Sequence, residues 1–150
     1  MQKIVEQKLS PAVFLALREK AGFPFYSSED SSEALDHTLY TVEIREEERT
    51  VGMARVVGDN RIAFFIKDVV VDPDYRGQGI GKLLLEAIFG YIRQHACKNA
   101  YVGLMATPGT EEFYEKFGFI RRPSPGLGCG MVQYLSPAEG GSTKENEVPR

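Results

Sequence analysis

The stretch VVVDPDYRGQGIGKLLL, from Val69 to Leu85, decides the fold of this 150-residue chain. It passes from an apolar run through a proline turn and three alternating glycines into a leucine-rich segment. From Leu84 to Ala96 the apolar residues repeat with the spacing of an amphipathic helix, whereas the run before the turn is typical of a buried strand. The order predicts a strand that crosses over into a helix, with the glycines at the helix start.

Two common phosphate-binding loops do not fit the glycines Gly77, Gly79 and Gly81. A Walker A loop needs a wider glycine spacing and a Ser or Thr after its lysine, where this chain has Leu83. A dinucleotide fingerprint needs G-x-G-x-x-G and an acidic residue about 20 positions further on, where this chain has Cys97. Both patterns are therefore excluded.

The same loop keeps the features of an anion site. Glycines let the backbone approach a ligand closely, and the N–H groups from Gln78 to Lys82 lie at the start of a helix, where they have no partner within it. Arg76 and Lys82 add positive charge at the edges. No metal ligand is evident, so the loop suits a pyrophosphate that is held and not cleaved.

Composition narrows the class of protein. The net charge of −3 argues against a nucleic-acid-binding surface, and no apolar run has the length of a membrane span. Two cysteines and two histidines offer neither a disulfide scaffold nor a metal site. We expect a cytoplasmic protein with one domain over residues 1–136 and a disordered tail over 137–150.

The remaining patterns predict an α/β fold whose sheet is mixed and mostly antiparallel. A first helix follows Ser10-Pro11, and a second, shorter one is capped by Ser31 or Ser32. Three strand segments are expected within residues 39–72, and the third is long enough to be either two strands or one strand with a bend near Lys67-Asp68. Past the crossover helix we expect a strand at 100–106, a short helix after Thr110 and a last strand at 129–135.

Two segments carry a family resemblance. The run Arg76-Gly77-Gln78-Gly79-Ile80-Gly81 resembles the R/Q-x-x-G-x-G/A acyl-CoA loop of the GNAT superfamily of N-acetyltransferases. The run FYEKFGF at 113–119 resembles the FYxxxGF block of that family, with a helix and a strand between the two motifs as the family requires. The resemblance implies a GNAT-like sheet with a splayed parallel strand pair and flanking helices.

The resemblance also implies a site for acetyl-CoA as cosubstrate, with no metal. The backbone of Val69 and Val71 would pair with the pantetheine arm, although both residues are equally typical of a plain core strand. Many members contact the pantetheine through an asparagine that precedes, by seven residues, the tyrosine matching Tyr114. Thr107 occupies that position in this chain. The pyrophosphate would be bound by Arg76, Gly77, Gln78, Gly79, Ile80, Gly81 and Lys82.

Two catalytic residues follow from the resemblance. Tyr114 would protonate the departing thiolate, or it would simply be a packed aromatic on its helix. Asp68 would be the base that removes a proton from the acceptor, or a structural carboxylate paired with Lys or Arg. Glu43 on an earlier strand is the second choice for the base.

The resemblance implies acetyl transfer from acetyl-CoA to a primary amine by direct attack in a ternary complex. We expect a small-molecule acceptor, recognised by the loop 23–32 and the glycine loop before the last expected strand. A protein lysine or N-terminus is the alternative acceptor, and a non-catalytic acyl-CoA sensor is the alternative function. Homodimers are common in the family, and the resemblance leaves a homodimer open as an assembly here.

Overall fold

The computed structural model describes residues 1–136, and they fall into two compact units. The first unit is Met1–Leu104 and the second begins at Met105. The expected disordered tail, 137–150, lies outside the described residues. That residues 1–136 act as one domain stays a prediction.

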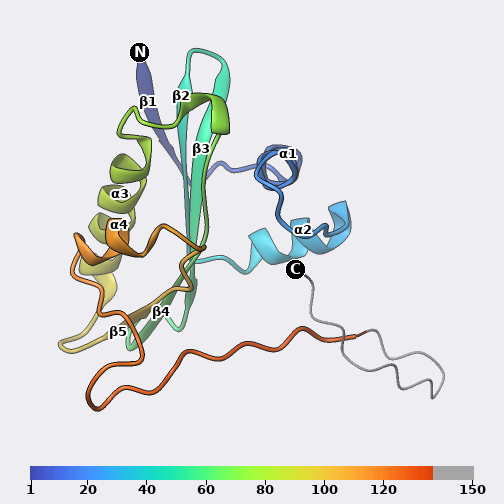
Figure 1. Cartoon of the computed structure of the whole chain (residues 1–150). Coiled ribbons are helices and arrows are strands. Elements are labelled where there is room, and N and C mark those ends of the chain that lie inside the picture. The colour runs from blue at the N-terminus through green and yellow to red at the C-terminus, as the bar shows by residue number, and fades with distance from the viewer. Residues whose placement is uncertain (137–150) are drawn as a thin grey trace. The chain divides into compact units, whose positions relative to one another are not determined.

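The first unit is a five-stranded sheet with helices on both faces (Figure 1). The strands lie in the order β1-β2-β3-β4-β5; neighbours are antiparallel except β4 and β5, which are parallel. The predicted class, a mixed and mostly antiparallel sheet with flanking helices, is confirmed. The elements are β1 Gln2–Glu6, α1 Pro11–Lys20, α2 Ser28–Asp36, β2 Tyr40–Glu46, β3 Arg49–Gly58, β4 Ala63–Val71, the 3-10 turn η1 Pro73–Tyr75, α3 Ile80–His95 and β5 Tyr101–Gly103.

The sequence patterns missed β1. Its five residues pair antiparallel with β2 at the edge of the sheet, with Ile4 opposite Ile44 and Val5 opposite Glu43. Both Ile4 and Val5 leave part of their surface to solvent, so no run of alternating apolar residues marks the strand. An edge strand of this kind depends on a neighbour that is distant in the sequence.

The two N-terminal helices begin at hydroxyl caps, as helix starts usually do. Ser10 caps α1 through its side chain and Pro11 takes the first helical position, as predicted. For α2 the predicted cap at Ser31 or Ser32 is wrong, because Ser27 accepts from the Asp30 N–H and the helix starts earlier. The earlier start places Glu29 and Asp30 in the first turn, where the helix dipole stabilises acidic side chains.

Helix α3 packs on one face of the sheet and α1 on the other (Figure 1). Under α3, a Cβ built on Gly52 of β3 would lie 2.6 Å from the Ile80 Cγ2, so only glycine permits this close approach. Ile80 is the first residue of α3, and the contact therefore fixes where that helix starts over the sheet. On the opposite face the buried cluster consists of Leu9, Phe14, Leu17, Met53 and Val70.

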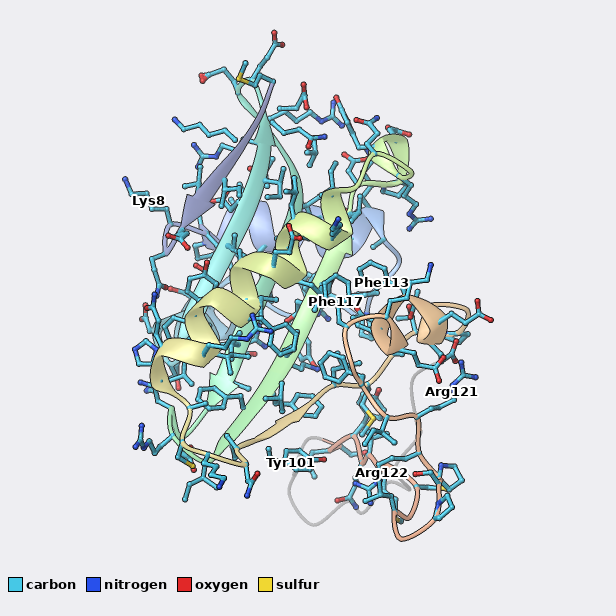
Figure 2. The ribbon with its side chains drawn as sticks, turned by 90° about the vertical axis from the view of Figure 1, so that its left-hand side faces the viewer. Lys8, Tyr101, Phe113, Phe117, Arg121 and Arg122 are labelled. Atoms are coloured by element: carbon cyan, nitrogen blue, oxygen red, sulfur yellow. The ribbon has the colours of Figure 1, made fainter. Side chains whose placement is uncertain are left out.

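The second unit contains the short helix α4, Glu111–Glu115, which follows Thr110 as predicted. Figure 2 labels Phe113 and Phe117, whose rings pack at a centroid distance of 5.3 Å. The predicted strand at 129–135 is wrong: residues 131–136 have no regular structure, and Met131 and Leu135 are exposed. An alternating apolar pattern makes a strand only where another strand is available for its hydrogen bonds.

We predict that Gly52→Ala lowers the free energy of unfolding by about 1–3 kcal/mol, because the added methyl group overpacks the contact with Ile80. Urea unfolding followed by circular dichroism measures the change. Gly90→Ala is the matched control, since a Cβ at Gly90 meets no atom within 4 Å and alanine favours the helix. A Gly52→Ala protein as stable as the wild type would contradict the close-packing role.

Candidate active site

The glycine loop lies directly before α3, as the sequence predicts. Gly77 and Gly79 have φ values of 78° and 80°, a left-handed region that side chains with a Cβ rarely occupy. Gly79 is the N-cap of α3 and offers no side chain to the helix start. The first helical bond runs from the Leu83 N–H to the Gly79 carbonyl, so the preceding N–H groups have no partner within the helix.

This arrangement is an anion site in its physical properties. The partial positive charge of the α3 macrodipole adds to the unpaired N–H groups at its start. The side chains of Arg76, Gln78 and Lys82 are exposed around the loop, while Ile80 is buried beneath it. The predicted pyrophosphate-binding residues, Arg76 to Lys82, thus lie in the glycine loop and the first turn of α3.

A buried carboxylate, Asp72, holds the start of this loop, and sequence reasoning missed it. Its side chain accepts from the Asp74 N–H at 2.9 Å and pairs with Lys20 at 2.8 Å and Arg49 at 3.2 Å. Burial acts to raise the pKa of Asp72, but the hydrogen bonds from Lys20 and the Asp74 N–H lower it overall. Asp72 therefore joins α1 and β3 to the turn that leads into the loop.

The parallel pairing of β4 with β5 is short. Only Ala63, Phe64 and Phe65 have partners on β5, which ends at Gly103. Strand β4 continues to Val71, and there its other edge still pairs with β3. Within residues 1–104 the outer edge of β4 beyond Phe65 thus has no strand beside it.

That open edge contains the two predicted pantetheine contacts. Val69 and Val71 lie beyond the last parallel pair and directly before the turn into the glycine loop. Their side chains are half-buried, as core residues would be, so a ligand would meet the backbone. A strand edge of this kind presents N–H and C=O groups that can pair with an extended amide-containing chain.

Strand β4 has a bulge at Asp68, which confirms the predicted bend near Lys67-Asp68. Met53 and Arg55 on β3 face Val70 and Lys67 on β4, so two steps on one strand correspond to three on the other. Asp68 has a φ of 55°, in the left-handed region. The bulge interrupts the alternation that would separate the side chains of Lys67 and Asp68 onto opposite faces.

Asp68 itself is buried between two arginines. Its Oδ1 accepts from Nη1 of Arg18 on α1, and its Oδ2 accepts from Nε of Arg55 on β3 at 2.6 Å. We call Arg18, Asp68 and Arg55 the Asp68 cluster. The structural alternative for Asp68, a carboxylate paired with arginine, is therefore the geometry that the protein has.

The second-choice base, Glu43 on β2, is also fully engaged. Its side chain is 1% exposed and accepts from the Thr50 hydroxyl at 2.8 Å, with Arg45 at 3.4 Å. Neither carboxylate is free to meet a substrate in this geometry. A sequence pattern does not show this, because the partners lie on other strands and helices.

Tyr114 and Thr107 belong to the second unit and are described within it. The Tyr114 ring lies edge-on to Phe113 at 5.1 Å and to Phe119 at 6.1 Å, and burial raises the pKa of its hydroxyl. Thr107 is exposed, and its carbonyl accepts from the Thr110 hydroxyl at 2.7 Å. Both predicted roles stay predictions.

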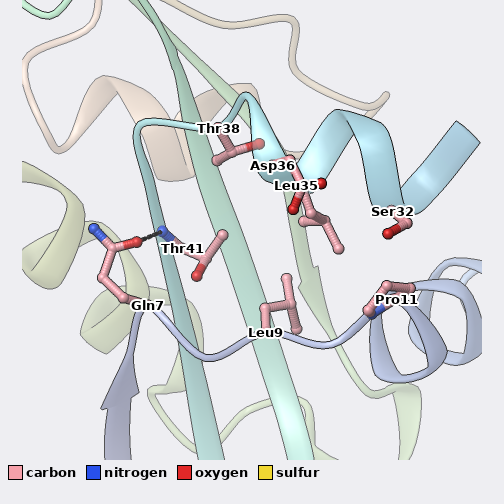
Figure 3. A pocket seen from close by; sticks show the side chains of 8 residues that line it. All are labelled: Gln7, Leu9, Pro11, Ser32, Leu35, Asp36, Thr38 and Thr41. Carbon is pink, nitrogen blue, oxygen red and sulfur yellow. Dashed lines mark hydrogen bonds between the residues drawn. The ribbon is translucent and has the colours of Figure 1, made fainter.

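An open cavity of about 230 Å³ lies between α2, the β1–α1 connection and the start of β2 (Figure 3). Leu9 and Leu35 give it an apolar wall, and the Asp36 carboxylate and two threonine hydroxyls give it a polar one. Arg55 donates to the Thr38 hydroxyl at 3.1 Å and so joins the wall to the Asp68 cluster. The lining residues are Gln7, Leu9, Pro11, Ser32, Leu35, Asp36, Thr38 and Thr41.

The loop expected over residues 23–32 is shorter than predicted, because residues 28–32 belong to α2, and its aromatic part lies against Arg18. The rings of Phe23 and Tyr26 lie 5.3 and 5.1 Å from its guanidinium carbon, close enough for cation–π contact. Phe25 is exposed. Two of the three aromatics therefore anchor the loop to α1.

Two further observations concern the part of the chain that the structure describes. In residues 1–136 no three His, Cys, Asp or Glu side chains are grouped to hold a metal ion. Over the same range no helix has the length and apolar character needed to cross a membrane.

Comparison with known proteins agrees with this geometry. The sequence profile of the family described as "Acetyltransferase (GNAT) domain" matches residues 36–121. The structure of SA2161 from meticillin-resistant Staphylococcus aureus, a protein of unknown function named as a probable acetyltransferase, superposes with a TM-score of 0.81 at 33% identity. That match covers 89% of this chain and all of the other. The protein belongs to the GNAT superfamily of acetyltransferases.

Curated relatives are longer than this chain. GCN5-related N-acetyltransferase 2, chloroplastic, of Arabidopsis thaliana is 37% identical over 97 residues, which cover 65% of this chain and 35% of the relative. Histone acetyltransferase TAP1 of Glycine max is 40% identical over 78 residues, which cover 52% and 33%. The structure of glucosamine-6-phosphate N-acetyltransferase from Arabidopsis thaliana has a TM-score of 0.69 at 22% identity, covers 91% of this chain and 99% of that one, and supports the fold alone.

We predict that Gly79→Ala weakens acetyl-CoA binding. The alanine relaxes out of the left-handed region in the free protein, and returning it there on binding costs about 1–2 kcal/mol, or roughly 10-fold in the dissociation constant. Isothermal titration calorimetry measures that constant.

Gly22→Ala is the control for backbone strain. Gly22 follows α1 with a φ of 82°, and a Cβ there, as at Gly79, meets no atom within 4 Å. Both variants should lose similar stability, while only Gly79→Ala should lose affinity for acetyl-CoA. Equal affinities in the two variants would reject the loop as the pyrophosphate site.

Proposed function

We propose that the protein transfers the acetyl group of acetyl-CoA to a primary amine by direct attack in a ternary complex. The observation that carries this proposal is the open edge of β4, which runs directly into an anion site at the start of α3. A pyrophosphate at residues 76–82 and an extended arm along Val69 and Val71 would use both features at once. Membership of the GNAT superfamily supports the same cosubstrate.

The reaction needs no covalent intermediate on the protein. The amine nitrogen attacks the thioester carbonyl carbon, the C–S bond breaks, and the thiolate takes up a proton as it leaves. We propose that Tyr114 supplies that proton. Because burial raises the pKa of Tyr114, its hydroxyl stays protonated at neutral pH and can donate.

The acceptor amine must be uncharged when it attacks, since an ammonium ion has no lone pair. Asp68 and Glu43 are both engaged by arginine side chains, which disfavours either as the proton acceptor. We propose that the amine loses its proton to water before or during attack. This leaves amines of lower pKa as the better substrates.

The class of acceptor is proposed as a small molecule. The aromatic loop residues Phe23 and Tyr26 support this choice only indirectly, because both pack on Arg18 of α1. A protein acceptor is the second candidate, favoured by the likeness to a soybean protein named as a histone acetyltransferase. The matched segment covers only 33% of that relative, so the substrate in its name is not assigned to this protein.

We predict that Tyr114→Phe lowers kcat by about 100-fold while the dissociation constant of acetyl-CoA changes little, because the phenol acts only on the leaving thiolate. Because burial raises the pKa of Tyr114, the wild-type hydroxyl is protonated at neutral pH and loses its proton only above the ordinary pKa of a tyrosine. We therefore expect no fall in the wild-type rate below pH 10 through loss of the Tyr114 proton. Below pH 10 the pH profiles of the wild type and Tyr114→Phe should have the same shape.

Phe117→Leu serves as the packing control, because Phe117 is on the same short aromatic cluster and carries no hydroxyl. If Tyr114→Phe and Phe117→Leu change melting temperature alone and leave kcat intact, Tyr114 is a packed aromatic. Steady-state rates over the full pH range, with melting temperatures for each variant, measure this.

We predict release of free CoA thiol when the protein is mixed with acetyl-CoA and an amine. A thiol-reactive dye follows release across polyamines, amino sugars, arylalkylamines, amino acids and lysine-containing peptides. Turnover with small amines above the hydrolysis rate supports the proposed class, and turnover with peptides alone supports a protein acceptor. Tight binding of acetyl-CoA without release by any amine would make the protein an acyl-CoA sensor.

A further inference from the structure

The bulge at Asp68 lies where β4 changes from a paired to an open strand. The last parallel pair is at Phe65, three residues before Asp68, and Val69 and Val71 follow on the open side. A bulge re-aims the backbone groups beside it and often occurs next to active sites. Whatever fixes this bulge also fixes the direction of the N–H and C=O groups along the open edge.

The backbone at the bulge would not hold its shape unaided. A residue with a side chain at a φ of 55° is strained, although aspartate tolerates this region better than most. Such a conformation persists only where surrounding contacts determine it. Asp68 has contacts of that kind on both oxygens of its carboxylate.

The Asp68 cluster ties the bulge to four other segments. Arg18 brings in helix α1 and also donates to the Pro24 carbonyl at 2.9 Å in the following loop. Arg55 brings in β3 and donates to the Thr38 hydroxyl at the end of α2. The side chains of Arg18, Asp68 and Arg55 are 8%, 3% and 14% exposed, so water screens these bonds little.

Aromatic rings also pack against the two arginines of the Asp68 cluster. The Arg18 guanidinium lies over Phe14, Phe23 and Tyr26, and the Arg55 guanidinium lies over Phe14 as well. The Arg18 Nε is buried without a hydrogen-bond partner and faces this aromatic environment instead. Both guanidinium groups thus contact aromatic rings as well as the carboxylate.

The same contacts remove Asp68 from proton transfer. A general base needs an oxygen within hydrogen-bond reach of the proton that it takes. Here each oxygen accepts from a guanidinium, and guanidinium groups stay protonated in proteins. Protonation of Asp68 would also leave two buried arginines facing a neutral group.

We propose that Arg18, Asp68 and Arg55 are positioning residues that lock the β4 bulge and so aim the open edge of β4 at the acyl-CoA thioester. The proposal rests on the proposed use of acetyl-CoA by this protein. It replaces the catalytic base that the sequence resemblance assigned to Asp68. The cluster acts through the backbone next to Val69 and touches neither reactant.

The test compares Arg55→Gln, Asp68→Asn and the double variant with the wild type. Calorimetry gives the dissociation constant of acetyl-CoA, and thiol release over pH 6–10 gives the pH dependence of kcat/KM. Each single variant should weaken acetyl-CoA binding by about 10-fold, because the open edge loses its fixed direction. The double variant should lose no more affinity for acetyl-CoA than either single variant, since each of the three variants disrupts the same cluster.

The pH profile separates positioning from proton transfer. If the cluster positions the bulge, every variant keeps the wild-type shape of the profile. If Asp68 were the base, Asp68→Asn would abolish turnover and leave the affinity for acetyl-CoA intact. That result overturns the proposal.

Two control variants account for stability and for the loss of an arginine. Ile44→Val removes a methylene group from the buried part of β2, and Arg61→Gln removes an exposed arginine that donates to the His95 carbonyl. The positioning role is overturned if the cluster variants weaken acetyl-CoA binding no more than Ile44→Val does at the same loss of stability. Arg61→Gln should bind acetyl-CoA as the wild type does.

Failure of the proposed function gives a different result. A wild-type protein that binds acetyl-CoA without turnover of any amine rejects the transferase activity, and the affinities still test the cluster. A wild-type protein that binds no acetyl-CoA rejects both. If the wild type binds acetyl-CoA and turns over an amine, and the cluster variants bind acetyl-CoA equally well, only the positioning role of the Asp68 cluster is rejected.

Discussion

The site depends on the early end of one strand pairing. Strand β4 has a parallel partner for three residues only, and it then continues with a single paired edge toward the glycine loop. Within residues 1–104 no strand pairs with its other edge there, and we propose that a ligand uses those backbone groups, in a part of the sheet whose side chains are packed on both faces. A core strand can therefore serve as a binding surface without an exposed side chain.

Several contacts with α1, α3 and β3 keep this edge of β4 in place. Gly52 lets the start of α3 approach β3, which places the helix N-terminus beside the end of β4. Asp72 connects the turn after β4 to Lys20 and Arg49, and Asp68 connects the bulge to Arg18 and Arg55. Two buried carboxylates, Asp68 on β4 and Asp72 directly after it, are each paired with basic side chains from α1 and β3. Helix α1 thus supports both ends of the open segment.

Much of this was predictable from local patterns. The glycine loop, the helix after it and the bend near Asp68 follow from spacing and residue type, because a left-handed turn and a helix start have local sequence requirements. The cap at Ser27, the edge strand β1 and the absence of a strand at 131–136 did not follow. Each of these depends on partners that are distant in the sequence.

The role of Asp68 shows the same division most clearly. The motif placed an acidic residue near the expected thioester, which made a catalytic base a reasonable hypothesis. Arg18 lies 50 residues away and Arg55 lies 13 residues away, and neither belongs to a recognisable motif with Asp68. The chemistry of a carboxylate depends on what its oxygens contact, and only packing decides those contacts.

By itself the sequence determined the glycine loop, the helix that follows it and the family to which they belong, since these rest on backbone requirements within a few residues. The tertiary structure decided where β4 loses its partner, which basic side chains engage the carboxylates and what supports the loop. Those properties arise from segments that meet only when the chain folds, so the spacing of residues along the chain does not contain them.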